Sequence, residues 1–226
     1  GALIARMDLD TTKAKNALQQ IISDFENRKI DILVGTQMVT KGLDFDHVSL
    51  VSILNADNML SYPDFRSAER SYQLMAQVSG RSGRKNKRGL VIIQTRQPKH
   101  IIIRQVVEND YQGMYERQLS ERQRFGYPPF TRLILVKLKH RETEFLNKAS
   151  AFLASELRKK FGNNILGPEY PIVSKIMNLY IKNIMIKIGS GRKLPEDKDT
   201  LKDIISRFQQ ATEYKSVRVI LDVDPQ

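Results

Sequence analysis

The chain of 226 residues contains no cysteine. It can therefore form no disulfide bond, no thiolate zinc site and no cysteine nucleophile of its own. Histidine is also scarce, since His47, His100 and His140 are the only three, and they are scattered along the chain. No clustered carboxylates accompany them in the sequence, so we expect no metal site here and no catalytic role for these histidines.

Long apolar runs are missing as well, although 41% of the residues are hydrophobic. A run such as Ile101-Ile102-Ile103 is only a few residues long, far short of the ~20 apolar residues that cross a bilayer. The sequence does not open with a basic segment followed by an apolar one, so we expect no signal peptide. Together with the lack of cysteine, these absences are consistent with a cytoplasmic protein.

Acidic residues are too few to balance the basic ones. The chain has 37 Lys and Arg residues against 25 Asp and Glu residues, which gives a formal net charge of +12. Each phosphate that a protein neutralises releases condensed counterions and so strengthens the binding of nucleic acid. The charge fits a nucleic-acid partner, and it fits a soluble basic domain without an acidic partner equally well.

Helices and short apolar strands alternate in the first part of the chain. Thr11 and Thr12 can cap a helix that runs to about Lys29. The other elements expected here are strands Ile30–Val34, Val48–Leu54 and Leu90–Thr95 and helix Ser67–Val78. Strands without strict polar alternation, separated by helices, indicate a parallel sheet covered on both faces. Gly35 and Leu54 then lie at the carboxyl ends of strands, where such sheets bind ligands.

The second part of the chain has a different rhythm. Pro128-Pro129 cannot continue a helix, so residues 98–130 are expected to form a helical connector. The elements expected after it are Leu133–Lys139, Thr143–Phe161, Tyr170–Ile176, Leu179–Ile188, Asp199–Ala211 and Val217–Val223. Their order, β-α-β-β-α-β, is that of an α+β ferredoxin-like fold. The predicted domains are therefore residues 1–97, 98–130 and 131–226.

Two segments of the first domain carry residues suited to nucleotide chemistry. The first is Gly35-Thr36-Gln37-Met38-Val39-Thr40-Lys41-Gly42-Leu43-Asp44-Phe45, directly after an expected strand. Its backbone N–H groups and short hydroxyls suit phosphate oxygens, and Asp44 can accept from a ribose hydroxyl or an arginine. The segment is not a P-loop, because Thr40 stands where a P-loop has its second glycine. Alone, such a loop is usually just a turn.

The second segment is Gln77-Val78-Ser79-Gly80-Arg81-Ser82-Gly83-Arg84, at the end of an expected helix. An arginine that reaches the γ-phosphate of a nucleotide stabilises the charge of the phosphoryl-transfer transition state, worth about 10³–10⁵ in rate. Alone, this segment also fits a solvated basic loop. The occurrence of both segments, in this order and on one α/β lobe, favours the nucleotide interpretation.

The two segments together resemble motifs V and VI of superfamily 2 helicases. Further segments make nearly the whole chain similar to the primosomal protein N′ family, the replication-restart DNA helicases of bacteria. These segments are Arg6-Met7-Asp8-Leu9-Asp10-Thr11-Thr12, Tyr62-Pro63-Asp64-Phe65-Arg66-Ser67-Ala68-Glu69-Arg70, Glu121-Arg122, Pro128-Pro129-Phe130 and Leu221-Asp222-Val223-Asp224-Pro225. The resemblance implies a partial RecA-like helicase lobe 2 with motifs IV–VI, followed by the ferredoxin-like domain.

The resemblance also implies roles for the matching residues. Arg81 and Arg84 would face the γ-phosphate, with Arg84 as the arginine finger, and Gln77 would sense the nucleotide. Gly42 and Asp44 would contact the ribose edge or an arginine and couple hydrolysis to movement. The backbone of the DNA strand would be contacted by Thr36, Gln37 and Lys41, and the glycines needed for the shape of the motifs would be Gly35, Gly80 and Gly83.

For the complete protein, the resemblance implies ATP hydrolysis that drives 3′→5′ movement on forked or single-stranded DNA and restarts replication by primosome assembly. The implied partners are primosomal proteins and the single-stranded-DNA-binding protein, in the cytoplasm and at the nucleoid during replication. ATP with Mg²⁺ would be bound mainly by a first lobe that is absent here, and zinc by a cysteine-bearing insertion that is also absent. We therefore expect this chain alone to have no ATPase activity.

Two other functions remain open from the residues. The chain fits a non-enzymatic basic module that binds nucleic acid through its ferredoxin-like domain, although that leaves both motif segments unexplained. It also fits another superfamily 2 DNA translocase.

Overall fold

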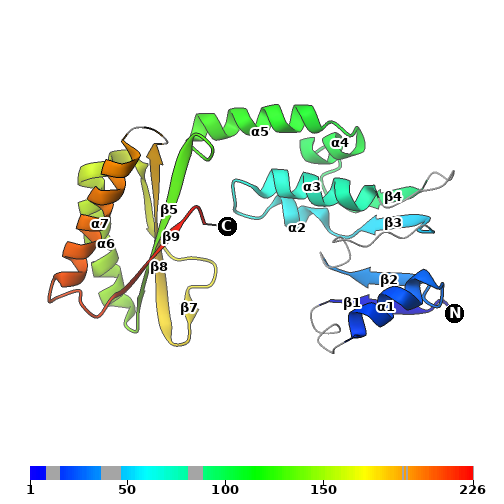
Figure 1. Ribbon diagram of the computed structural model, residues 1–226, viewed down its shortest axis with the longest axis horizontal. Coiled ribbons are helices and arrows are strands. Elements are labelled where there is room, and N and C mark those ends of the chain that lie inside the picture. The colour runs from blue at the N-terminus through cyan, green and yellow to red at the C-terminus, as the bar shows by residue number, and fades with distance from the viewer. Residues whose placement is uncertain (9–15, 37–46, 81–88, 190, 192, 226) are drawn as a thin grey trace. The chain divides into compact units, whose positions relative to one another are not determined.

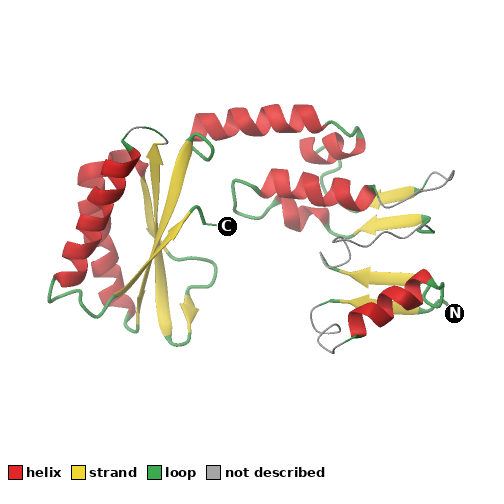
Figure 2. Cartoon of the chain, in the orientation of Figure 1, coloured by secondary structure: helices red, strands yellow, loops and turns green. Residues whose placement is uncertain are grey.

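The computed structural model describes residues 1–8, 16–36, 47–80, 89–189, 191 and 193–225. The chain forms two compact units, Gly1–Gln118 and Leu119–Gln226 (Figure 1). Helix α5 (Tyr111–Phe125) belongs to both units, because the boundary between them falls within it. Each unit combines helices with strands (Figure 2).

The first unit contains two pairs of parallel strands. Its elements are β1 (Ile4–Met7), α1 (Ala17–Glu26), β2 (Ile32–Gly35), β3 (Leu50–Ile53), α2 (Ala56–Leu60), α3 (Ser67–Ser79), β4 (Leu90–Ile93) and α4 (Ile101–Val107). β1 pairs with β2, and β3 with β4. A tight turn cannot join parallel partners, so α1 lies in the first connection and α2 and α3 lie in the second. The expected parallel strands are present, but within the described residues they form two separate pairs.

The buried core of the first unit lies among its helices. It is composed of Ala56, Tyr72, Met75, Ile102, Ile103 and Met114, contributed by α2, α3, α4 and the first turn of α5. Ile53 and Ile93, at the ends of β3 and β4, pack against this core. The helices that follow Pro98 therefore help to build the first unit.

The expectation that the strands are covered on both faces is wrong for the described residues. Along β3 and β4 exposure alternates, so that Ile53 and Ile93 are half-buried while Leu50 and Leu90 are 50% and 59% exposed. Ile32 of β2 is exposed in the same way. The reason is that α1 packs on β1 and α3 packs on β3, and the described chain places no helix on the opposite faces (Figure 1).

Helix α1 differs from its expected limits. It begins after Asn16, which has a φ of 97°, and it ends at Glu26, shortly before Arg28 with a φ of 58°. Asparagine tolerates the left-handed region better than most residues. The expected caps Thr11 and Thr12 lie outside the described residues.

The second unit is an antiparallel sheet with helices on one face. Its elements are β5 (Thr131–His140), α6 (Thr143–Phe161), the 3-10 turn η2 (Gly162–Asn164), β6 (Ile165–Glu169), β7 (Lys175–Ile176), β8 (Leu179–Gly189), α7 (Leu194–Gln210) and β9 (Arg218–Val223). The strand order is β6-β8-β5-β9, and β7 pairs with β8. α6 and α7 lie side by side on the same face (Figure 1). Alternate residues of the central strands, such as Val136 and Ile186, are fully buried against Leu153 and its neighbours on α6.

Of the strand expected over Tyr170–Ile176, only the last two residues, Lys175 and Ile176, form a strand, β7. The sheet instead uses β6, five residues earlier, because Ile165 pairs with Ile186 and is buried in the core. Pro171 has no N–H to donate to a neighbouring strand, and Ile172 is 79% exposed. The apolar residues of this segment are therefore exposed and do not indicate a buried strand.

Candidate functional site

The first motif segment begins at the carboxyl end of a parallel strand. Gly35 is the last residue of β2 and pairs with Met7 of β1, and Thr36 follows it with an exposed side chain. This is the edge of an α/β sheet at which ligands bind. Gln37, Lys41, Gly42 and Asp44 lie outside the described residues.

The second motif segment begins at the carboxyl end of α3. Gln77 is exposed and lies in the last turn of the helix. Gly80 caps the helix by donating its N–H to the carbonyl of Ala76 at 3.0 Å, with a φ of −67°. A Cβ on Gly80 would meet only an ordinary contact of 3.5 Å, so the described backbone itself would accept another residue there. Arg81, Gly83 and Arg84 lie outside the described residues.

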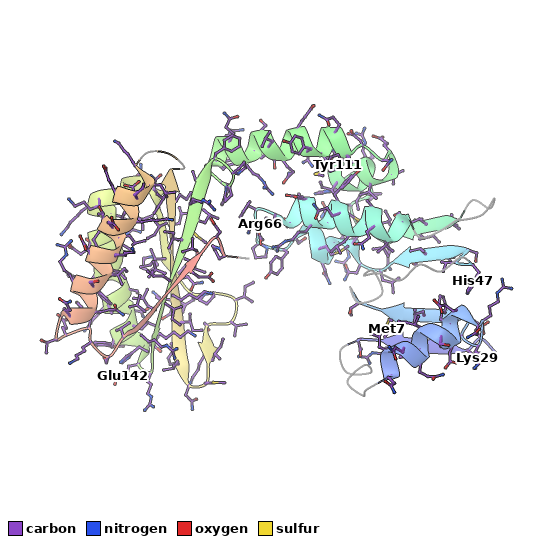
Figure 3. The ribbon with its side chains drawn as sticks, viewed as in Figure 1. Met7, Lys29, His47, Arg66, Tyr111 and Glu142 are labelled. Atoms are coloured by element: carbon purple, nitrogen blue, oxygen red, sulfur yellow. The ribbon has the colours of Figure 1, made fainter. Side chains whose placement is uncertain are left out.

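The turn between α2 and α3 is held by a carboxylate. Asp64 accepts a hydrogen bond of 2.7 Å from the N–H of Arg66 and forms an ion pair of 3.2 Å with Arg70. The guanidinium of Arg66, labelled in Figure 3, lies 4.2 Å from the ring centroid of Phe65. Phe65 is half-buried. The pair thus forms a cation–π contact within the turn.

A second carboxylate ties the end of β4 to the start of α2. Asp57 accepts from the hydroxyl of Thr95 at 2.6 Å and from the N–H of Arg96 at 2.8 Å. The bond from Thr95 is the largest cause, and that from Arg96 the next, of a pKa of Asp57 below its ordinary value of 3.8. Asp57 therefore stays ionised and fixes the turn that leaves β4.

Sequence reasoning missed the basic residues of that turn. Arg96 and Lys99 are exposed, and His100 caps α4 by accepting from the N–H of Ile102. The signal that could have found them is their spacing: three basic side chains occur within five residues, directly after a parallel strand.

The three histidines have structural surroundings. Nε2 of His47 lies 3.1 Å from the carbonyl oxygen of Phe25. Nδ1 of His140 accepts from the N–H of Glu142 at 3.0 Å, while His100 caps α4. In the described part of the chain no three His, Asp or Glu residues cluster in a way that could hold a metal ion. Nor does any described helix have the length and apolar character that a membrane crossing requires.

Comparison with known proteins gives two family matches. The helicase conserved C-terminal domain matches residues 3–86, and the primosomal protein N C-terminal domain matches residues 123–226. Because the first of these domains is a helicase domain, it implies a RecA-like lobe in the first unit.

Curated relatives carry one name, replication restart protein PriA. The protein of Bacillus subtilis is 39% identical over 226 residues, covering 99% of this chain and 28% of the relative. Those of Haemophilus influenzae and Thermotoga maritima are 36% and 32% identical, over 99% and 98% of this chain and 30% and 28% of their own length. The chain thus spans less than a third of these relatives. It belongs to the replication restart protein PriA family and corresponds to its carboxy-terminal region.

Proposed function

We propose that the protein containing this chain is an ATP-dependent DNA helicase that moves 3′→5′ at stalled or abandoned replication forks and restarts replication by primosome assembly. The names of the relatives and the helicase domain over residues 3–86 support this proposal. The observation that carries it is the exposed side chain of Gln77 in the last turn of α3, at the start of the segment that ends at Arg84. The net charge of +12 is consistent with DNA as the partner.

In this proposal residues 1–97 act as the second motor lobe. Arg84 and Arg81 reach the γ-phosphate of ATP, which a lobe outside this chain holds with Mg²⁺, and Gln77 senses the nucleotide. ATP supplies the free energy for movement when its γ-phosphate is hydrolysed. Gly42 and Asp44 couple that hydrolysis to movement along the strand.

Contacts to the DNA backbone come from the first motif segment. Thr36, Gln37 and Lys41 contact the strand along which the enzyme moves. Gly35 and Gly83 shape the two motifs, whereas the described backbone at Gly80 would accept another residue. Thr36 and Gln77 are both exposed, as side chains that reach a nucleotide or DNA need to be.

We propose further that residues 131–226 form a ferredoxin-like domain, joined to the motor by residues 98–130. The strand order β6-β8-β5-β9, with two helices on one face, supports this assignment. Because this fold hosts many functions, its role here is assigned by family: it offers a surface to DNA, to primosomal proteins or to the single-stranded-DNA-binding protein. The protein then works in the cytoplasm, at the nucleoid, and zinc belongs to an insertion outside this chain.

The arginine assignment is tested in the full-length protein. Arg84→Ala is expected to lower DNA-dependent ATP hydrolysis by about 10³-fold or more, while fork DNA binding largely survives. Arg104→Ala is the matched control, because it removes an exposed arginine of α4 outside both motifs. Normal hydrolysis by the Arg84 variant, or an equal loss of hydrolysis and binding, would contradict the assignment.

The division of the motor between two lobes has its own test. The purified 226-residue chain is expected to hydrolyse no ATP, with or without DNA, because the groups that hold the phosphates and activate water belong to the other lobe. DNA-dependent hydrolysis by the highly purified chain would refute this.

A further inference from the structure

Basic side chains of the turn that follows β4 line an open hollow. Five consecutive residues, Arg96 to His100, line a hollow of ≈ 470 Å³. Arg96 and Lys99 are exposed, and none of the five lining residues is acidic. β4 is parallel to β3, and the space beyond the carboxyl ends of parallel strands is where α/β sheets bind ligands.

Hydrogen bonds hold the backbone of this turn in one shape. The carboxylate of Asp57 accepts from Thr95 and Arg96, and the N–H of Gln97 donates to the Thr95 hydroxyl at 3.0 Å. The N–H of His100 donates to the carbonyl of Gln97 at 2.9 Å. A site that is already ordered loses less conformational entropy when a ligand binds.

His100 adds a further donor to the two cations. Its Nδ1 accepts a hydrogen bond of 3.3 Å from the N–H of Ile102. Because Nδ1 accepts, Nε2 is the ring nitrogen that carries a proton and can donate it. Arg96, Lys99 and His100 therefore all offer N–H donors around the hollow, which suits a ligand with several acceptor oxygens.

The charges near the hollow favour an anion. Asp57 lies close enough to interact electrostatically with Arg96 and His100, but both its oxygens are already bonded to the turn. Two permanent cations, Arg96 and Lys99, stand against this one carboxylate. A phosphate group matches both the excess positive charge and the donors.

We propose that Arg96, Lys99 and His100 form a binding site for a phosphodiester group of single-stranded DNA. The proposal rests on the proposed function for the identity of the ligand and adds a contact that neither helicase motif contains. The hollow is open and has room for a phosphate group of a strand that runs along this surface. Contacts of this kind position the strand without reading its bases.

The test uses the 226-residue chain and a labelled oligothymidine over a range of salt concentrations. Arg96→Ala/Lys99→Ala is expected to weaken binding and to reduce the slope of log K against log salt by about 0.7 for each phosphate that the protein no longer neutralises. The double variant Arg104→Ala/Lys29→Ala is the matched control, because it removes the same two charges from exposed side chains that do not line the hollow. An oligonucleotide of mixed bases should show the same weakening.

The outcomes separate this site from the proposed function. An equal weakening in both double variants would overturn the site and leave the helicase assignment intact, since that assignment depends on Arg84 and ATP hydrolysis. NMR signals of the His100 ring should shift with oligothymidine. If they shift with inorganic phosphate or ATP and not with oligothymidine, the hollow binds free phosphate groups and the assignment to DNA is wrong.

Discussion

The hydroxyl of Thr95 donates a hydrogen bond of 2.6 Å to the carboxylate of Asp57, across 38 positions of the sequence. This bond joins the turn after β4 to the first turn of α2. It positions the backbone on which Arg96 and its neighbours are held, so it links the stability of the first unit to the geometry of the proposed phosphate site.

Removal of that hydroxyl should loosen the turn. Thr95→Val keeps the shape of the side chain but leaves Asp57 and the N–H of Gln97 without this partner, since both bond to the hydroxyl. We expect faster amide hydrogen exchange over residues 94–100, measured by mass spectrometry. Thr212→Val, at an exposed position after α7, is the control. Hydrogen exchange as slow as in the unmodified protein would show that the Thr95–Asp57 hydrogen bond contributes little to the order of the turn.

The same carboxylate predicts a dependence on acid pH. The pKa of Asp57 is lowered below 3.8, chiefly by the hydroxyl of Thr95 and then by the N–H of Arg96. A lowered folded-state pKa means that the stabilisation is complete above the unfolded pKa and is lost as the pH falls through the folded pKa. Asp57→Asn should therefore be less stable than the unmodified protein at neutral pH, and thermal unfolding should show this difference shrinking below about pH 4. A difference in stability that stays constant with pH would contradict the stabilising role assigned to the ionised Asp57.

Local patterns in the sequence located most elements, because the period of apolar residues is set within each element. Helix α3 was expected over Ser67–Val78 and is found over Ser67–Ser79, and β4 begins at the expected Leu90. The errors concern features that depend on distant residues. The exposed faces of β3 and β4 reflect which helices pack on them, and β6 is defined by the pairing of Ile165 with Ile186.

In the candidate site too, local features were predictable from the sequence and features that depend on distant residues were not. The sequence predicted that Thr36 follows a strand and that Gln77 ends a helix, because motif spacing and element boundaries are both local. It did not predict the hydrogen bonds that Asp57 accepts or the hollow beside Arg96, because folding alone brings α2 next to the end of β4. The roles of Arg81, Arg84 and Asp44 stay predictions.

Gly167 should be the least replaceable described glycine of the second unit. It has a φ of +88°, and a Cβ there would lie 2.7 Å from the carbonyl oxygen of Asn183 on the neighbouring strand. Gly167→Ala combines backbone strain with a clash against backbone that cannot move independently. Gly162→Ala is the matched control, since Gly162 also has a positive φ, +56°, but nothing lies within 4 Å of the added Cβ. The Gly167 variant should lose about 1–3 kcal/mol more of its free energy of unfolding, measured by urea denaturation. Equal losses in the two variants would mean that backbone strain, and not the clash with Asn183, causes the loss of free energy of unfolding.

The core between α6 and the sheet should dominate the stability of the second unit. Leu153 is fully buried among residues of β5, β8 and α7. Leu153→Ala is expected to cost about 2–5 kcal/mol, because it removes apolar packing and leaves a cavity. Lys160→Ala, on the exposed side of the same helix, should change the free energy of unfolding by no more than about 0.5 kcal/mol. Similar effects of the two variants in urea denaturation would be incompatible with this core.

Lys187 fastens the end of α5 to β8. Its ammonium group donates to the carbonyl oxygen of Phe125 at 2.7 Å and lies 3.8 Å from the ring centroid of Tyr127. Lys187→Met keeps the aliphatic stem but removes both interactions, at a cost of about 1 kcal/mol at neutral pH. Lys139→Met, on the neighbouring strand β5, makes the same chemical change elsewhere and should cost less in urea denaturation.

The pH dependence of the Lys187 variant tests whether burial or the two interactions govern this amine. Burial lowers the pKa of Lys187 from its ordinary 10.5, so the unfolded chain binds a proton more readily than the folded one in the range just below that value. The stability that Lys187 contributes should then rise with pH through that range, and the difference from Lys187→Met should widen. If the difference narrows instead, the carbonyl of Phe125 and the ring of Tyr127 stabilise the charged form by more than burial destabilises it.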